Sequence, residues 1–229
     1  MKLTTKLLAA TAIVGATSAG AVDLEVTHWW TSGGEANAVS KLAEAFDAGT
    51  EHTWIDGAIA GGGGTARPIM VSRIIGGDPM GAFQFNHGRQ AQELIEEGLL
   101  LDLTDVAEAN NWKEIIRPSS ILDACTLDGR IYCAPLNIHS AQWLWLSNQA
   151  YADAGVPVPA NWDEFVASAP ALEAAGKVPM AMGQQPWQTN LAFGAMTIAL
   201  AGIEDWSAVN IDRNVDVARG DSYTKVFEA

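Results

Sequence analysis

LEVTHWWTSGGE, residues 24–35, combines a strand-like run, two adjacent tryptophans, a glycine turn and the start of a helix. Leu24 and Val26 alternate with polar residues, which is typical of a short strand. Ser32 followed three residues later by Glu35 forms a capping-box pattern, and an apolar stripe with helical spacing comes after it. The stretch predicts a strand–turn–helix unit, the first unit of an α/β fold.

The two indoles of Trp29 and Trp30 stand at the carboxyl end of the predicted strand. In open α/β sheets this is the edge at which ligands bind. Core packing is the alternative role for both rings. Neighbours in an extended chain point to opposite sides, however, so one core is not expected to bury both. We predict that at least one of the two rings faces a ligand.

The rest of the chain continues to alternate between strand-like and helix-like segments. Strands are predicted at residues 52–60, 82–85, 130–135, 142–146 and 178–182, and a strand or extended segment at 99–103. Helices are predicted at 66–75, 90–97, 111–117, 148–154, 184–201, from Asn161 and from near Asp221. In the helix at 66–75, Ile69, Met70 and Ile74 are expected to point inward. This alternation predicts α/β lobes with largely parallel sheets.

The N-terminus has the pattern of a cleavable secretory signal peptide. Lys2 and Lys6 form a short basic region, residues 7–15 are apolar, and Ala19-Gly20-Ala21 is a small-x-small cleavage pattern. We expect cleavage after Ala21 and export across a bacterial inner membrane to the periplasm. Pro135 lies between two strand-like runs and predicts passage between lobes. The expected division is therefore a signal peptide at 1–21, a first lobe at 22–134, and a crossing segment with a second lobe at 135–229.

The chain is strongly acidic, with a formal net charge of −14. Loss of the signal peptide removes two lysines and no acid, so the exported form is more acidic still. Such a surface gains nothing from nucleic-acid phosphates or anionic lipids. Nucleic acid is therefore not an expected partner.

The two cysteines, Cys125 and Cys133, flank a short segment that contains Asp128-Gly129, a hairpin signal. A three-residue loop centred on Gly129 would place the cysteines opposite each other, and an oxidising compartment favours a disulfide between them. Two free thiols are the alternative. A metal pair fits poorly, because no histidine is close in sequence and the spacing matches no common zinc pattern.

No motif in the sequence specifies a reaction. The chain has neither G-x-S-x-G nor H-E-x-x-H, its four histidines are scattered, and the glycines at 61–64 are not followed by the lysine of a phosphate loop. We predict no metal, no cofactor and no enzymatic activity. A glycosidase acid pair among the many carboxylates is the remaining enzymatic alternative.

Nine tryptophans in 229 residues is a high content, and several fall at predicted element ends. Sugars present C–H faces that lie on aromatic rings, and hydroxyls that carboxylates and amides can hold. Five residues at the ends of the first and third strands supply this mixture: Trp29, Trp30, Glu35, Gln84 and Asn86. Each polar member also has a structural explanation: Glu35 as part of the capping box, Gln84 as a pleat residue and Asn86 as a turn residue.

Several longer segments together carry a family resemblance. Together with the signal peptide, they resemble periplasmic sugar-binding proteins of ABC importers. The segments are HWWTSGGE, IAGGGGTARP, AFQFNHGRQ, EEGLLLDLTD, IYCAPLNIHSAQWLWLSN, GVPVPANWDEF and PMAMGQQPWQTNLAFG. The resemblance runs from about Leu24 to Ala201. It is strongest to the glucose/mannose-binding type within the extracellular solute-binding protein family 1.

The resemblance implies a periplasmic-binding-protein-like fold of two α/β lobes joined by a hinge. It implies a monomer that closes on a monosaccharide and delivers it to the membrane permease. Trp29, Trp30 and Glu35 match the family's first binding motif, and Gln84 and Asn86 match its second, where relatives commonly carry histidine in place of Asn86. Further implied contacts are Asn137 and His139 in the crossing segment, and Trp187 in the second lobe.

Members of that family are about twice as long as this chain. The resemblance therefore implies that the rest of the second lobe and the return to the first are missing, so we expect the chain alone to bind sugar weakly or not at all. The alternatives to a sugar receptor are an exported carbohydrate-active enzyme and a truncated, non-functional product of a receptor gene.

Overall fold

The structure is a computed structural model that describes residues 20–86, 88–139 and 143–229. The chain divides into two compact units, the first ending at Leu136 and the second beginning at Asn137. The predicted lobe boundary after Ala134 stays a prediction, and the predicted signal peptide lies almost wholly outside the described residues. In the described ranges, no helix combines the length and the apolar character needed to cross a bilayer.

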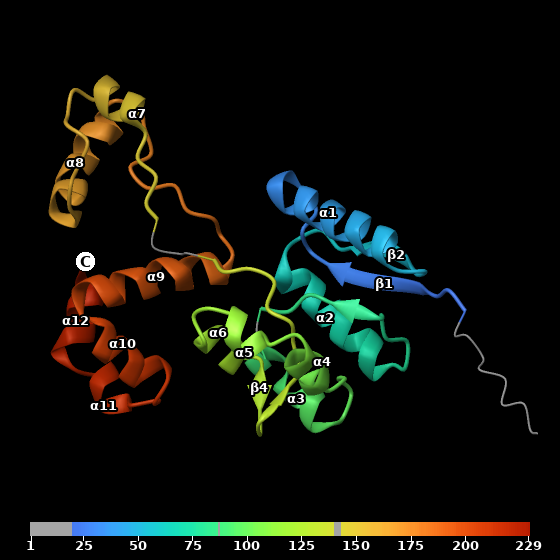
Figure 1. Cartoon of the computed structure of the whole chain (residues 1–229). Helices are drawn as coiled ribbons and strands as arrows, with labels where there is room; N and C mark the ends of the chain where they lie inside the picture. The colour runs from blue at the N-terminus through green and yellow to red at the C-terminus, as the bar shows by residue number, and fades with distance from the viewer. Residues whose placement is uncertain (1–19, 87, 140–142) are drawn as a thin grey trace, which may run out of the picture. The chain divides into compact units, whose positions relative to one another are not determined.

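The first unit is built on a three-stranded parallel sheet. Its strands are β1 (Asp23–His28), β2 (Thr53–Ala58) and β3 (Ala82–Phe83), in the order β2-β1-β3. Helices α1 (Gly33–Gly49) and α2 (Gly63–Ile75) connect them and lie on opposite faces of the sheet (Figure 1). From β1 the chain passes through α1 to β2 on one side of β1, and from β2 it passes through α2 to β3 on the other side. The carboxyl ends of β1 and β3 therefore form a topological switch point, where sheets of this kind bind ligands.

The core of this unit lies under α2. Ala66, Met70 and Ile74 project from one side of the helix at the i, i+4 spacing and pack with Met80 and Leu94. Met70 is completely buried, as predicted. The prediction for Ile69 is wrong: its side chain is 43% exposed, because it lies about 100° around the helix from Met70.

An ion pair between Arg73 and Glu25 links α2 to β1. Arg73 donates from Nη1 to Glu25 Oε1 at 2.5 Å and from Nη2 to Glu25 Oε2 at 2.9 Å. Two parallel bonds of this kind fix both the distance and the orientation of the partners. The hydrogen bonds from Arg73 lower the pKa of Glu25, and the positive charge of Arg73 adds to the effect.

The Glu25–Arg73 pair predicts that the difference in stability between the wild type and Glu25→Gln depends on pH. A lowered folded-state pKa contributes stability that is present above the ordinary glutamate pKa and is lost as the pH falls through the folded-state value. Glu25→Gln should therefore unfold at a lower urea concentration than wild type at pH 7, and the difference should vanish in strong acid. Glu44→Gln is the matched control, since the Lys41–Glu44 pair is well exposed and should contribute little. Equal urea midpoints for wild type and Glu25→Gln at pH 7 would contradict the assignment.

The rest of the first unit is a set of short elements. They are η1 (Gly88–Ala91), α3 (Gln92–Glu96), α4 (Thr104–Ala109), α5 (Trp112–Ile115), α6 (Ser120–Asp123), β4 (Thr126–Leu127) and β5 (Arg130–Ile131). Leu94 of α3 belongs to the core under α2, whereas residues from Leu103 to Cys133 build a second cluster of apolar side chains. The prediction for residues 99–103 is a strand or an extended segment, and these residues form no strand. Asp102 instead accepts the backbone N–H of Thr104 at 2.9 Å, and α4 begins there.

The hairpin between β4 and β5 differs from the prediction by one residue. Its loop is Asp128-Gly129 alone, with positive φ at both positions, so Cys125 lies opposite Tyr132 rather than opposite Cys133. The Tyr132 N–H donates to the Cys125 carbonyl at 2.9 Å. Cys125 and Cys133 are nevertheless joined by a disulfide, with their Cα atoms 5.1 Å apart.

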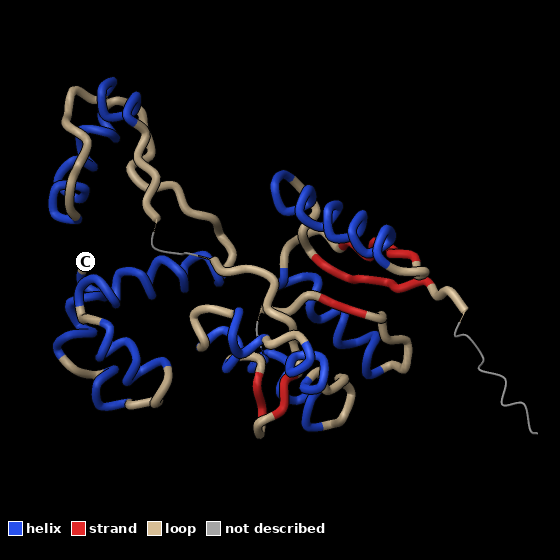
Figure 2. The backbone as a smooth tube through the Cα atoms, viewed as in Figure 1, coloured by secondary structure: helices blue, strands red, loops and turns tan. Residues whose placement is uncertain are grey.

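The described part of the second unit is helical (Figure 2). Its helices are α7 (Asn148–Asp153), α8 (Trp162–Ala174), α9 (Pro186–Leu200), α10 (Ile203–Asn210), α11 (Val215–Ala218) and α12 (Asp221–Glu228). Residues 143–146 and 178–182 are not strands, contrary to prediction, and residue 142 lies outside the described ranges. A strand needs a paired neighbour for its backbone groups, and neither segment has one among the described residues.

Candidate functional site

The candidate site is built at the carboxyl edge of the parallel sheet. The backbone remains tied together just beyond the strand ends: the Ile59 N–H donates to the His28 carbonyl at 2.8 Å, and the Gln84 N–H donates to the Thr27 carbonyl at 2.9 Å. The residues that follow β1 and β3 are therefore held close together. Trp29 and Gln84 are among them, as the sequence pattern predicts.

Trp29 is half-buried and packs against the core under α2. Its ring lies beside Gly63 at the start of α2, so close that a side-chain Cβ at that position would be 3.2 Å from Cζ2 of the indole. The Trp29 N–H donates to Gln84 Oε1 at 3.1 Å. Gln84 thus uses its acceptor to hold the backbone of Trp29, and no described residue takes a hydrogen bond from its amide NH₂ group.

Trp30 is buried, with 8% of its surface exposed, and its N–H donates to Nδ1 of His28 at 3.2 Å. His28 is buried as well, and its Nε2 is hydrogen-bonded to Asp56 of β2. Neither His28 nor Asp56 is among the site residues that the sequence pattern predicts. Asp56 lies opposite Val26, two positions before His28, so only the strand register could have shown the pairing.

Glu35 lies in the first turn of α1, where the predicted capping box is wrong. Ser32 does occupy the N-cap position, but its side chain makes no capping hydrogen bond. Glu35 is exposed, and in the described ranges its carboxylate has no hydrogen-bond or ion-pair partner. Asn86, two residues after Gln84, is exposed too. Both polar groups are therefore open to solvent.

Three predicted site residues lie in the second unit. Asn137 Nδ2 and His139 Nε2 are 2.9 Å apart, and both side chains are exposed. Trp187, in the first turn of α9, is 53% exposed, and its Nε1 donates to Gln185 Oε1 at 2.6 Å. That bond fixes the edge of the indole while much of the ring stays accessible.

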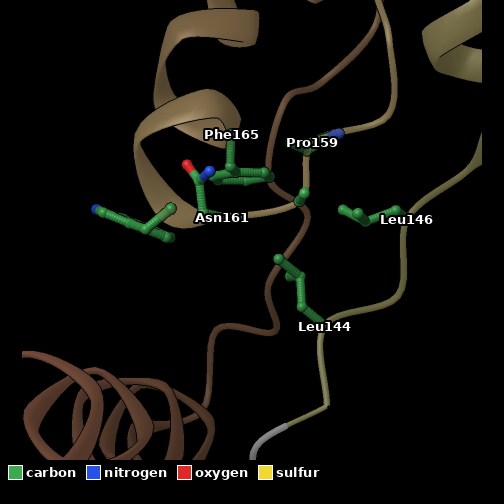
Figure 3. Close-up of a pocket in the computed structure, with 7 residues that line it drawn as sticks. Leu144, Leu146, Pro159, Asn161 and Phe165 are labelled. Carbon is green, nitrogen blue, oxygen red and sulfur yellow. The ribbon is translucent and has the colours of Figure 1, made fainter.

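The second unit also contains an apolar cavity of about 280 Å³ beside the start of α8 (Figure 3). Its lining residues are Leu144, Leu146, Pro159, Ala160, Asn161, Trp162 and Phe165. The Asn161 side chain already accepts the Glu164 N–H at 3.0 Å and donates to the Glu164 carboxylate at 2.9 Å. The lining is mainly apolar, so the cavity is suited to apolar packing rather than to holding the hydroxyls of a sugar.

Comparison with known proteins identifies the family. Residues 30–227 match the model of the bacterial extracellular solute-binding protein family. A "probable sugar-binding periplasmic protein" of Brucella melitensis is 34% identical over 207 residues, which cover 90% of this chain and 48% of that protein. A protein of Rhizobium meliloti with the same description is 32% identical and covers 99% of this chain and 54% of its own length. The chain thus spans about half the length of these relatives.

Solved structures confirm the fold class. A chitin oligosaccharide binding protein superposes with a TM-score of 0.64 at 21% identity, covering 91% of this chain and 53% of its own. The bacterial solute receptor AcbH, described by its preference for β-D-galactopyranose, gives 0.64 at 18% identity and covers 91% and 52%. At this identity the likeness concerns the fold, and it agrees with the predicted α/β, periplasmic-binding-protein-like class. The chain belongs to the bacterial extracellular solute-binding protein family.

Proposed function

We propose that the protein is the substrate-binding component of an ABC sugar importer. It captures a monosaccharide of the glucose/mannose type in the periplasm, after cleavage of the signal peptide behind Ala21, and delivers it to the membrane permease. Support comes from the family match and from the sugar-binding descriptions of the relatives. In this proposal the protein acts as a monomer, needs no cofactor and breaks no bond of the sugar.

The half-buried Trp29 ring at the switch point is the observation that carries this proposal. The ring packs against the core under α2, and Gln84 holds the backbone N–H of the same residue, so the ring offers an apolar surface at the ligand-binding edge of the sheet. A hexose ring lying on such a surface buries its C–H face. The NH₂ group of Gln84, which no described residue engages, then donates to a sugar hydroxyl.

Glu35 and Asn86 supply the remaining polar contacts at this edge of the sheet, which we call the sugar-binding wall. A carboxylate that is neither capping a helix nor paired can accept protons from two adjacent hydroxyls through strong, charge-assisted hydrogen bonds. Glu35 meets this condition, because the structure leaves its carboxylate unengaged within the described residues. Trp30, being buried, contributes mainly by supporting its neighbour.

The second unit also carries residues that we propose as sugar contacts. The exposed Asn137–His139 pair offers hydrogen-bonding groups that already hold each other in place. Trp187 offers a second aromatic face whose N–H is already satisfied. We propose these three residues as sugar contacts from the second lobe.

A ligand-observed titration tests the sugar contact. Of the two expectations for the chain alone, weak binding or none, the proposed site favours weak binding. One aromatic surface and a few hydrogen bonds on the first unit correspond to a binding free energy near −4 kcal/mol, or a Kd of about 1 mM. Saturation-transfer NMR with glucose, mannose, galactose and short chitin and xylan oligosaccharides should therefore give a signal for glucose or mannose at millimolar concentrations. Trp29→Ala should weaken that binding by about tenfold, the equivalent of 1.4 kcal/mol.

Trp145→Ala is the matched control for this titration. Trp145 is 89% exposed, lies in the second unit and belongs to no proposed contact, so its removal should leave the signal unchanged. No signal for any sugar, or an equal loss from both variants, would contradict the proposed site. Selective binding of an oligosaccharide would overturn the monosaccharide assignment, and hydrolysis of a glycoside by the chain would overturn the receptor proposal in favour of an enzyme.

A further inference from the structure

Two consecutive peptide N–H groups at the end of β1 are held by side chains rather than by a neighbouring strand. The Trp29 N–H is bound by Gln84 at 3.1 Å, and the Trp30 N–H is bound by His28 at 3.2 Å. The chain leaves the sheet here, so neither donor has a strand partner. A buried donor left without a partner would cost much of its desolvation energy.

The hydrogen-bond roles of the His28 ring follow from its partners. A backbone N–H can only donate, so Nδ1 of His28 is the acceptor for Trp30. In that tautomer Nε2 carries the proton and donates it to the carboxylate of Asp56. The main chain of His28 is fixed as well, because its carbonyl accepts the Ile59 N–H. The result is a continuous series of hydrogen bonds from β2 to the tryptophan pair, through Asp56, His28 and the Trp30 N–H.

We propose that His28 and Asp56 are positioning residues that fix the backbone of Trp29 and Trp30 at the end of β1 before a sugar binds. This inference rests on the proposed sugar-binding function. Asp56 orients the imidazole, and the imidazole holds the Trp30 peptide. With that peptide fixed, the Trp29 ring stays in its orientation against the α2 core. A wall already ordered in the free protein loses less conformational entropy on binding, which raises affinity without any new contact.

Two substitutions at His28 separate the two halves of its role. The Oδ1 atom of asparagine occupies nearly the position of Nδ1, so His28→Asn keeps an acceptor for the Trp30 N–H and gives up the bond to Asp56. The Nε2 atom of glutamine occupies nearly the position of the histidine Nε2, so His28→Gln keeps a donor for Asp56 and removes the acceptor for Trp30. Both variants are close to histidine in polarity, and both lose part of a buried ring. A difference between them therefore reports the Trp30 bond.

Amide hydrogen exchange, followed residue by residue with NMR, tests the hydrogen bond in the absence of sugar. In His28→Gln the Trp30 amide should exchange at least about tenfold faster than in wild type, while the Trp29 amide, held by Gln84, keeps its protection. His28→Asn should restore most of the Trp30 protection. Asp56→Ala should show partial loss at Trp30. Equal Trp30 protection in wild type and in His28→Gln would overturn the assigned bond.

The same variants, titrated with glucose and mannose, test the positioning role. His28→Gln should bind sugar about tenfold more weakly than wild type, and His28→Asn should bind more tightly than His28→Gln. Loss of Trp30 protection with unchanged sugar affinity would overturn the positioning role and leave the proposed function standing. If the wild type binds no sugar while the exchange pattern is as expected, the proposed function fails and the hydrogen-bond assignment stands.

Discussion

Met70→Ala should lower the free energy of unfolding by about 2–5 kcal/mol, the range found when a large buried side chain is truncated. Met70 is completely buried at the centre of the α2 core, where it packs with Ala66, Ile74 and Leu94. Truncation removes its own contacts and leaves a cavity that well-packed neighbours fill only in part. Because Trp29 packs against the same core, truncation of Met70 should also disturb the position of the Trp29 ring at the candidate site.

Ile69→Ala is the matched control for Met70→Ala. The two residues are adjacent on α2, but Ile69 is 43% exposed and lies outside the buried cluster, so its truncation should cost well under half as much. Urea unfolding followed by far-ultraviolet circular dichroism measures both. Equal losses for the two variants would contradict the assignment of Met70 to the core and of Ile69 to the surface.

Cys133→Ser should lower the free energy of unfolding of the oxidised protein by about 2–3 kcal/mol. The disulfide closes a loop with a sequence separation of 8, and in the chain-entropy model a loop of that length restricts the unfolded chain by this amount. Cys133 is the better position to substitute, because it is only half-buried whereas Cys125 is buried in the second core cluster.

Reduction of the wild type provides the internal control for the disulfide. The reduced wild type and Cys133→Ser should unfold at nearly the same urea concentration, and the oxidised wild type at a higher one. Coincident transitions for the oxidised and reduced wild type would show that the bridge contributes nothing. A much larger loss in Cys133→Ser than on reduction would assign the effect to packing instead.

The first unit was largely predictable because its signals are local. Alternation at Leu24–Thr27, the N-cap at Ser32 and the i, i+4 spacing of Met70 and Ile74 each act over a few residues, and the structure has the corresponding strand and helices. The carboxyl edge of a parallel sheet is a property of topology, so the closeness of Trp29 and Gln84 followed from the strand order. The choice among roles was less predictable: Glu35 matched a capping box that does not form.

The remaining differences depend on register and on neighbours that a local pattern cannot show. The hairpin at Asp128-Gly129 has a two-residue loop, and a shift of one residue changed which residue faces Cys125. His28 and Asp56 meet only through the pairing of β1 with β2. Residues 178–182 have strand-like composition, but strand formation requires a paired partner, which the described second unit does not provide.

A residue-resolved sugar titration tests the central claim most directly. Backbone and side-chain amide shifts of the wild-type chain, recorded by NMR while glucose or mannose is added to tens of millimolar, report where the sugar lies. We predict shifts that saturate together at the Trp29 indole, the Gln84 side-chain amide, Asn86 and the first turn of α1 around Glu35, and that are absent in Trp29→Ala. Shifts confined to other surfaces, or none at all at these residues, would contradict the assignment of the carboxyl edge of the sheet as the sugar-binding wall.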